Sequence, residues 1–233
     1  MIIGAGFIAK SFEEFYKTRE DIVIFASGVS DSQCSDIMEF YREEKLLSYV
    51  INNLLKNELL VYFSTCSVYS KKPQFSSKYI EHKLKMEKII ENSRKYLIIR
   101  IPQIAGFSSN QNTLLNYFWN KINNEQELKI IKNSWRNILD IDDIIIIVNK
   151  IILELKDNSV INVANPYSTP VIDIIHYMEK IINKRANLSF IELDEDSYEI
   201  DIGIMKKYID IKNFSFDEGY CFRAISRYYE RHK

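Results

Sequence analysis

The first hundred residues alternate short apolar runs with longer amphipathic segments. The apolar runs cover residues 2–3, 22–27, 59–64 and 96–101, and the helix-like segments cover residues 7–16, 35–56 and 77–92. Runs that are apolar throughout are typical of strands buried on both faces of a parallel sheet. Parallel neighbours need crossover connections, which are nearly always right-handed. The alternation therefore predicts an α/β chain with a doubly wound parallel sheet, where ligands bind outside the carboxyl ends of the strands.

The second half continues this pattern less regularly. Helices are expected near residues 113–123, 142–155 and 169–183, strands near 128–132 and 160–163, and a further helix in the tail. No repeat, linker or low-complexity tract separates the two halves. We therefore expect a core over residues 1–106, and a mixed segment with a small C-terminal lobe over residues 107–233 that packs on the core as one functional unit.

Composition excludes several classes of protein. Of the 233 residues, 46% are hydrophobic and 27% charged, and the net charge of -1 gives no bias towards nucleic acid or membranes. Cys34, Cys66 and Cys221 form no Cys-x-x-Cys, so reduced thiols are expected, without disulfides or a metal site. The start lacks the basic region of a signal peptide, and the longest aliphatic run, residues 144–148, cannot span a bilayer. A cytoplasmic protein that acts on small molecules is predicted.

A glycine turn, Gly4-x-Gly6-x-x-Ala9, joins the first strand to the first helix. Small residues at this place let the backbone approach a pyrophosphate at a helix N-terminus, as in Rossmann-like folds. Gly4, Gly6, Phe7 and Ile8 are therefore candidate cofactor-binding residues, and a purely structural glycine turn is the alternative. The acid that usually follows about 20 residues later and holds the adenine ribose is absent.

Three polar residues follow in an order that suits proton transfer. Tyr79 and Lys83 share one face of a predicted helix, where an ammonium can lower the pKa of a phenol that exchanges a proton with a carbonyl oxygen or an alcohol. Thr65 follows a buried strand, where its hydroxyl could hydrogen-bond a substrate oxygen. Taken singly, the Tyr-Lys spacing is common and Thr65 is an ordinary turn residue. Together they supply a hydrogen-bond donor, an acid or base, and a cation.

With these residues in view, the sequence resembles the extended short-chain dehydrogenase/reductases that act on nucleotide sugars, of the NAD-dependent epimerase/dehydratase type. The resemblance covers nearly the whole chain. It implies a dinucleotide-binding core and a substrate-binding lobe. The shared motifs, in the family's order, are Gly4-Ala5-Gly6-Phe7-Ile8-Ala9, Phe63-Ser64-Thr65-Cys66-Ser67-Val68-Tyr69, Tyr79-x-x-x-Lys83, Arg100-Ile101-Pro102 and Arg136-Asn137-Ile138-Leu139-Asp140-Ile141-Asp142-Asp143.

The resemblance also implies a role for each matched residue. The predicted catalytic residues are Thr65, Tyr79 and Lys83, and Tyr79 and Lys83 also contact the cofactor, Lys83 at the nicotinamide ribose. The loop flanking the nicotinamide is Pro102, Gln103 and Ile104. The residues expected to contact substrate are Thr65, Cys66, Ser67 and Arg136. The guanidinium of Arg136 would grip the diphosphate, and an ordinary surface charge is the alternative.

Two departures from the family narrow the reaction. The 4,6-dehydratases carry an Asp-Glu pair directly after the threonine, where this chain has Cys66 and Ser67, so dehydration is disfavoured. The run 22–27 resembles a later strand of the family, as if part of the adenine-binding half were deleted. Its end therefore supplies three further cofactor-binding candidates, Ala26, Ser27 and Gly28.

The expected activity is reduction of a nucleotide-linked 4-keto-6-deoxysugar, such as dTDP-4-keto-6-deoxyglucose, in the biosynthesis of deoxysugars for bacterial surface polysaccharide such as O-antigen. A reductase releases its cofactor at each turnover, so it tolerates a trimmed adenine site better than an epimerase does. NADP(H) is preferred over NAD(H) because no acid repels a 2′-phosphate and Lys10 lies near the fingerprint helix. The alternatives are a 4-epimerase and a non-catalytic protein that binds sugar nucleotides or dinucleotides. A homodimer is one option for its assembly.

Two weaker candidates are given structural interpretations. His82 should point away from the face that carries Tyr79, so an exposed helical histidine is expected. Asp140, Asp142 and Asp143 are expected to cap and charge the first turn of the helix that follows.

Overall fold

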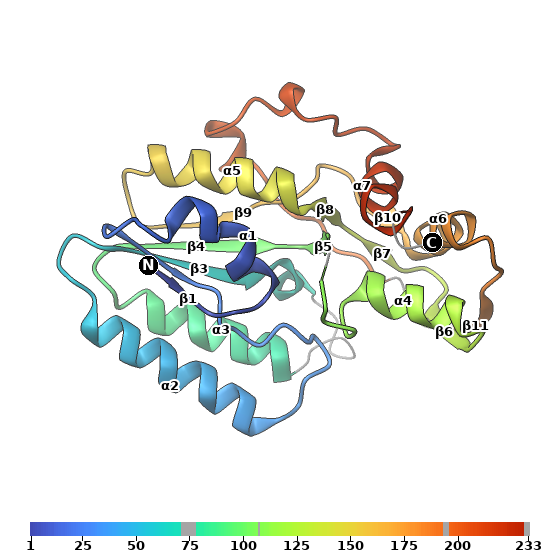
Figure 1. The fold of residues 1–233 in the computed structure, drawn as a ribbon, viewed down its shortest axis with the longest axis horizontal. Helices are drawn as coiled ribbons and strands as arrows, with labels where there is room; N and C mark the ends of the chain where they lie inside the picture. The colour runs from blue at the N-terminus through green and yellow to red at the C-terminus, as the bar shows by residue number, and fades with distance from the viewer. Residues whose placement is uncertain (71–77, 107, 193–195, 231–233) are drawn as a thin grey trace.

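A parallel sheet of five strands lies at the centre of the computed structural model, which describes residues 1–70, 78–106, 108–192 and 196–230. Every pairing in this sheet is parallel, and β3 is buried along nearly its whole length. The predicted α/β class and doubly wound sheet are confirmed (Figure 1). The strand order is β1 (Ile2–Ile3), β2 (Ile22–Phe25), β3 (Leu59–Thr65), β4 (Tyr96–Ile101) and β9 (Ser159–Asn162).

Helices cover both faces of the sheet (Figure 1). Leu60 and Tyr62 of β3 belong to a core cluster with residues of α2 and α3, whereas Val61 and Phe63 belong to the larger cluster that includes α1 and α5. This alternation follows from the two-residue period of a strand. The four helices are α1 (Phe7–Tyr16), α2 (Ile37–Asn53), α3 (Lys78–Ile90) and α5 (Ile141–Glu154). The predicted α3 began at residue 77, which lies outside the described residues.

The strand β1 lies at the edge of the sheet. Among the described residues it pairs only with β2. In the usual doubly wound order, 3-2-1-4-5-6, two strands lie on the far side of strand 1 and form the adenosine half of the site. Here α1 leads directly from β1 to β2, which lies on the same side of β1 as the rest of the sheet. The prediction of a shortened adenine half is therefore confirmed by the topology.

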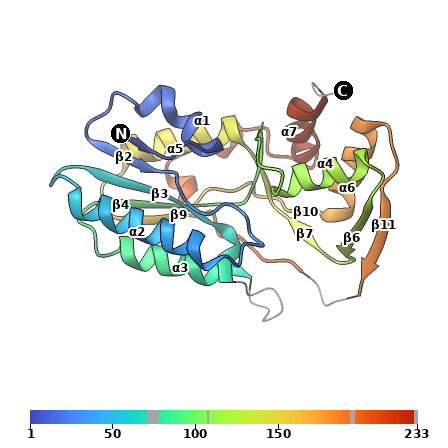
Figure 2. The ribbon, with the colours of Figure 1, turned by 60° about the horizontal axis from the view of Figure 1, so that its bottom comes forward.

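The C-terminal lobe lies beyond the carboxyl ends of the sheet (Figure 2). The larger core cluster runs through both parts without interruption. The division at residue 106 stays a prediction, and two of its bounds, residues 107 and 233, lie outside the described residues. The lobe contains α4 (Leu114–Asn123), α6 (Val171–Ile182), α7 (Tyr220–Tyr229) and the parallel pair β6 (Glu127–Ile131) and β11 (Asn187–Ile191). Two further pairs are β5 (Gln103–Ala105) with β8 (Ile138–Asp140), and β7 (Trp135–Arg136) with β10 (Thr169–Pro170).

The start of α5 agrees with the capping prediction. The carboxylate of Asp140 accepts a hydrogen bond from the N–H of Asp142 at 2.9 Å. The same carboxylate accepts from the Tyr228 hydroxyl at 2.7 Å, which ties α7 to this helix end. No helix among the described residues is long and apolar enough to cross a membrane.

Candidate active site

Thr65, Tyr79 and Lys83 lie together at the carboxyl end of β3. Thr65 is the last residue of that strand, and its side chain is hydrogen-bonded to Tyr79. The ammonium of Lys83 lies 5.9 Å from the centroid of the Tyr79 ring. The four-residue spacing on α3 turns both side chains towards β3, as the helical period requires. The structure thus brings the three predicted catalytic residues into one group.

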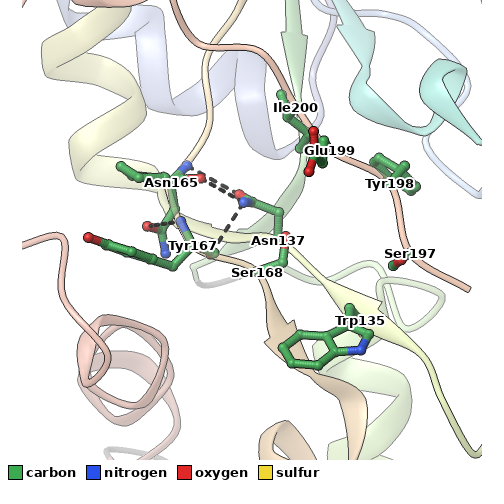
Figure 3. Close-up of a pocket in the computed structure, with 10 residues that line it drawn as sticks. Trp135, Asn137, Asn165, Tyr167, Ser168, Ser197, Tyr198, Glu199 and Ile200 are labelled. Carbon is green, nitrogen blue, oxygen red and sulfur yellow. Dashed lines mark hydrogen bonds between the residues drawn. The ribbon is translucent and has the colours of Figure 1, made fainter.

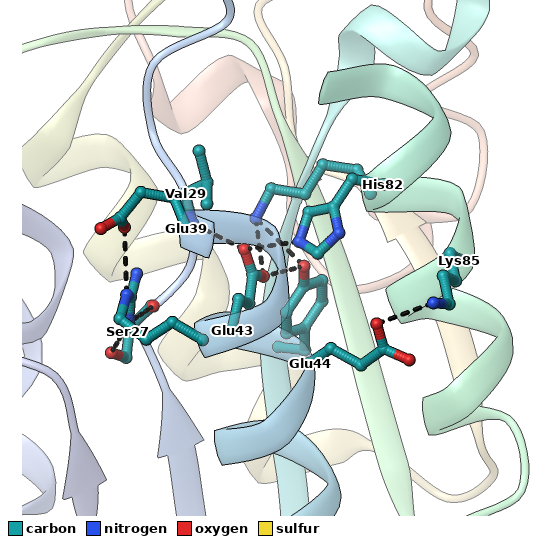
Figure 4. A network of polar contacts seen from close by, with 10 residues as sticks. Ser27, Val29, Glu39, Glu43, Glu44, His82 and Lys85 are labelled. Carbon is teal, nitrogen blue, oxygen red and sulfur yellow. Dashed lines mark hydrogen bonds and ion pairs between the residues drawn. The ribbon is translucent and has the colours of Figure 1, made fainter. Parts of the chain in front are cut away.

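A buried network around Glu43, which Figure 4 shows from close by, holds the ammonium of Lys83. This ammonium donates to Oε1 of Glu43 at 3.1 Å and to the Tyr62 hydroxyl at 3.0 Å. The Glu43 carboxylate also accepts from the Tyr62 hydroxyl at 2.7 Å and from the Val29 N–H at 2.6 Å. His82 Nε2 lies 3.0 Å from Oε2 of Glu43. Lys83 is therefore one half of a buried ion pair as well as a neighbour of Tyr79.

Glu43 was not predicted from the sequence, although a signal for it exists. Its position on α2 falls on the same stripe as the buried residues Leu47 and Val50. An acid on the apolar stripe of a helix needs a buried partner, because an unpaired charge in the interior is costly. The sequence does not say which cation meets it, because Lys83 lies 40 residues away.

The pKa values in this group follow from burial and charge. Burial alone would raise the pKa of Glu43, but the Lys83 ammonium and the hydrogen bonds from His82, Val29 and Tyr62 lower it to about 2. Burial lowers the pKa of Lys83, and the Glu43 charge acts against that. Burial raises the pKa of Tyr79, which exceeds the lowering effect of its hydrogen bond with Thr65. The expected lowering of the phenol pKa by Lys83 is thus not found, because burial disfavours the phenolate and the Glu43 charge adds to this effect.

The expectation of an exposed His82 was wrong. His82 is only 5% exposed, and its ring stacks on Phe40 with 4.6 Å between the centroids. The reason is that α2 packs alongside α3 and covers the helix face that was expected to meet solvent.

The predicted cofactor residues at the ends of β1 and β2 meet at one edge of the sheet. Gly4 has a φ of 131°, and a Cβ added to it would lie 2.4 Å from the carbonyl oxygen of Ala26. Only glycine fits this close approach, because it tolerates positive φ and lacks a Cβ. A Cβ added to Gly6 would meet nothing within 4 Å, so the space beside that residue is open. Ser27 follows Ala26 in the same turn.

Gly28 faces the ion pair. A Cβ added there would lie 2.6 Å from the Lys83 ammonium and 2.9 Å from Oε1 of Glu43. The glycine is therefore required by the packing of the charged network, whatever its contact with a cofactor.

The loop after β4 lies beside the catalytic group. Thr65 pairs with Ile101 at the ends of β3 and β4, so the loop that starts at Pro102 begins beside Thr65. Gln103 and Ile104 continue into β5 and are half-buried. The preceding Arg100 is structural, since its guanidinium forms two hydrogen bonds to Glu87, at 2.9 and 2.5 Å, and one to the Tyr69 hydroxyl at 2.8 Å.

The two residues after Thr65 have different surroundings. Cys66 is fully buried, and its thiol donates to the carbonyl of Arg100 at 3.4 Å. Burial raises the pKa of Cys66 to about 12. Ser67 is hydrogen-bonded through its side chain to Tyr198, a residue of the C-terminal lobe that sequence reasoning did not find. No local pattern marks Tyr198, because its contact is 131 residues away in the chain.

A cavity of about 470 Å³ is lined by residues of the C-terminal lobe (Figure 3). One wall is ordered by Asn137, whose amide donates to the Asn165 carbonyl at 2.7 Å and accepts from the Asn165 N–H at 3.2 Å. The lining residues are Trp135, Asn137, Asn165, Pro166, Tyr167, Ser168, Ser197, Tyr198, Glu199 and Ile200.

Arg136 stands next to this cavity in the chain but is engaged elsewhere. Its guanidinium donates to the carboxylate of Asp196 at 2.6 Å and to the Trp135 carbonyl at 2.7 Å. The side chain is 24% exposed, whereas that of Asp196 is 5% exposed. The predicted diphosphate contact of Arg136 stays a prediction.

Comparison with known proteins decides the family. The model of the NAD dependent epimerase/dehydratase family matches residues 8–164, more than half of the chain. The chain belongs to this family. Membership makes it an NAD(P)-dependent enzyme of the kind that acts on nucleotide sugars. No curated protein matches the sequence at a significant level.

Solved structures share the fold of this family member. RMD from Pseudomonas aeruginosa, solved with NADPH, is 15% identical over 100% of this chain and 98% of its own, with a TM-score of 0.71. A UDP-glucuronic acid 4-epimerase from Bacillus cereus is 20% identical over 97% and 79%, with a TM-score of 0.69. A dTDP-glucose 4,6-dehydratase from Bacillus anthracis is 14% identical over 96% and 77%, with a TM-score of 0.69. At these identities the likeness establishes the fold alone.

The residues at the end of β1 fit the pyrophosphate of the family's dinucleotide. The N-terminus of α1 carries no acid in its first turn, where an anion would be repelled, and Gly6 leaves open space beside it. Phe7 and Ile8 are half-buried in that turn. On the adenosine side, the described residues provide no strand beyond β1. The fit therefore covers the pyrophosphate and lacks the usual adenosine pocket.

Proposed function

We propose that this enzyme reduces a nucleotide-linked 4-keto-6-deoxysugar, such as dTDP-4-keto-6-deoxyglucose, with NADPH as the reductant. The observation that carries the proposal is the grouping of Thr65, Tyr79 and Lys83. The two positions directly after Thr65, where a dehydratase carries its acids, hold no carboxylic acid here. Cys66 has a pKa of about 12 and is buried, so it cannot replace the acid of a dehydratase. Ser67 is a hydroxyl hydrogen-bonded to Tyr198.

Each residue of the group has a distinct task. A bound reduced nicotinamide supplies the hydride that C4 of the ketosugar accepts. Tyr79 then gives its proton to the oxygen on C4, and its raised pKa keeps it protonated at neutral pH, which is the form that reduction requires. Thr65 hydrogen-bonds the same oxygen while negative charge develops. Lys83 provides positive charge 5.9 Å from the Tyr79 ring and an N–H for the nicotinamide ribose.

The shortened sheet supports a reductase over an epimerase. An epimerase keeps its cofactor bound through a ketone intermediate, which favours a full adenosine site, whereas a reductase releases it at each turnover. NADPH is the proposed donor because the end of β2 carries no acid against a 2′-phosphate, and Lys10 is exposed on α1. In this proposal the enzyme works in the cytoplasm and supplies deoxysugars for bacterial surface polysaccharide.

The C-terminal lobe is the proposed site for the sugar nucleotide. Arg136 would exchange its pairing with Asp196 for a diphosphate, to which a guanidinium fork can bind through two hydrogen bonds. The neighbouring Trp135 is 40% exposed and lines the cavity, so a nucleoside has an aromatic surface to pack against.

The deciding experiment is turnover with a panel of nucleotide 4-ketosugars. NADPH oxidation is followed by absorbance, and the product is identified by NMR. We expect stoichiometric formation of the 4-hydroxy sugar, and Tyr79→Phe serves as the inactive control. Redox-neutral conversion of nucleotide sugars would indicate the epimerase instead, and binding without turnover would indicate a non-catalytic protein.

A further inference from the structure

We propose that Glu43 is a positioning residue of this active site, which holds Lys83 protonated and fixes its ammonium beside Tyr79. The link to catalysis rests on the proposed function, because it assumes that Lys83 serves the reaction. The ion pair itself does not depend on that assumption.

The ammonium of Lys83 meets the carboxylate of Glu43 at 3.1 Å in the interior of the protein. The carboxylate is 0% exposed and the Lys83 side chain 3%. Two of the three N–H bonds of the ammonium are directed at Glu43 and Tyr62. Gly28 permits this arrangement, because it has no side chain and so leaves room for both charged groups. Lys83 is therefore held in one place before any substrate arrives.

Among the described residues, no carboxylate other than that of Glu43 is in direct contact with the Lys83 ammonium. Glu87, on the same helix as Lys83, contributes charge from a distance, but its two oxygens are engaged by Ser64 and Arg100. The like charge of Arg42 lowers the pKa of Lys83. The hydroxyl of Tyr62 accepts a hydrogen bond from the Lys83 ammonium.

The groups around the phenol and around the carboxylate complete this set. Besides burial, the charges of Glu43, Tyr198 and Asp31 raise the pKa of Tyr79. The hydrogen bond with Thr65 lowers it. His82 meets the second oxygen of Glu43.

The charge balance explains why this carboxylate matters. A buried ammonium without a counterion gives up its proton, because the neutral amine is less costly to desolvate. Opposite charge within hydrogen-bonding distance reverses that preference. Without Glu43, Lys83 would become neutral at a lower pH, and the cation that supports proton transfer from Tyr79 would be lost.

The direct test is the titration of Lys83 by NMR in protein labelled with ¹³Cε-lysine. The signal is assigned by its absence in Lys83→Met. We expect Lys83 to titrate at the lowest pH in Glu43→Gln, at an intermediate pH in Glu43→Asp, and at the highest pH in the native protein. The matched control is Glu44→Gln, the next residue, whose carboxylate pairs with the exposed Lys85. Identical titration of Lys83 in the native protein and in the Glu43 variants would overturn the proposal.

The Glu43→Asp variant keeps the test decisive if Glu43→Gln fails to fold, because it retains the charge and withdraws it from the ammonium. Activity gives the second readout. In the Glu43 variants kcat/KM should fall by about tenfold per pH unit above the lowered pKa of Lys83, at pH values where the native enzyme and Glu44→Gln remain active. A merely structural defect would lower activity equally at all pH values.

The two proposals fail in different ways. The lysine titration needs no substrate, so it decides the role of Glu43 even if no ketosugar is reduced. Absence of reduction by the native protein, with the expected titration, would refute the proposed function and leave the ion-pair assignment standing.

Discussion

Gly28→Ala places a methyl group against the buried ion pair. Its Cβ would lie 2.6 Å from the Lys83 ammonium, whereas ordinary contacts begin at 3.4 Å, so the nitrogen or the backbone must move by 0.8 Å. Lys83 has little freedom to move, because its hydrogen bonds to Glu43 and Tyr62 are already 3.1 and 3.0 Å long. Overpacking of this kind costs about 1–3 kcal/mol. At roughly 2 kcal/mol, the melting temperature should fall by about 4–8 °C.

Gly6→Ala is the matched control, since it adds the same methyl group to open space. No atom lies within 4 Å of the added Cβ, and the backbone at φ -78° is accessible to alanine. The loss of glycine at the start of α1 is offset by a less flexible unfolded chain, so the free energy of unfolding should change by less than about 0.5 kcal/mol. The methyl group would instead obstruct the pyrophosphate and weaken NADPH binding.

Urea unfolding followed by circular dichroism measures the first effect, and calorimetric titration with NADPH measures the second. The expected pattern is a less stable Gly28→Ala and a stable Gly6→Ala with weakened cofactor binding. The reasoning is refuted if Gly28→Ala unfolds at the same urea concentration as the native protein, or if Gly6→Ala is the less stable of the two.

Three further predictions concern the active site. Tyr79→Phe should lower kcat by at least about 10²-fold while NADPH affinity stays nearly the same, because the variant lacks only the hydroxyl that gives the proton. Steady-state kinetics with the ketosugar measure this, and undiminished turnover would contradict it. The folded pKa of Glu43 lies below its ordinary value of 4.5, at about 2, so its stabilising effect of about 3 kcal/mol is complete above pH 4.5 and is lost as the pH falls through about 2. The difference in unfolding free energy between the native protein and Glu43→Gln should therefore shrink as the pH falls through that range. A difference that stays constant would contradict this role of Glu43. Arg136→Gln should raise KM for the sugar nucleotide about tenfold or more and leave NADPH affinity unchanged, with equal KM values as the contrary outcome.

Local pattern was sufficient for most secondary structure. The helix Phe7–Tyr16 and the strand Tyr96–Ile101 have the bounds that were predicted, because helical and strand periods are read directly from neighbouring residues. One boundary was shifted by tertiary pairing: the helix expected to begin at Thr169 begins at Val171, because Thr169 and Pro170 pair with β7.

The spacing of Tyr79 and Lys83 was also enough to place both on one helix face, and the order of motifs was enough to suggest the family. The order of strands in the sheet was not available from periodicity, since neighbouring strands are chosen by packing. The edge position of β1 became visible only when the strands were assembled, although the missing acid had indicated a shortened half.

Contacts across the chain decided the rest. Glu43 and Lys83 are 40 residues apart, and Arg136 and Asp196 are 60 apart, so no local period connects either pair. His82 illustrates the physical reason: the helix period assigned it a face, but whether that face meets water or another helix depends on where α2 packs. Sequence periodicity determines which residues share a face, whereas burial, and with it the charge state of Lys83, is set by the elements that the fold brings against that face.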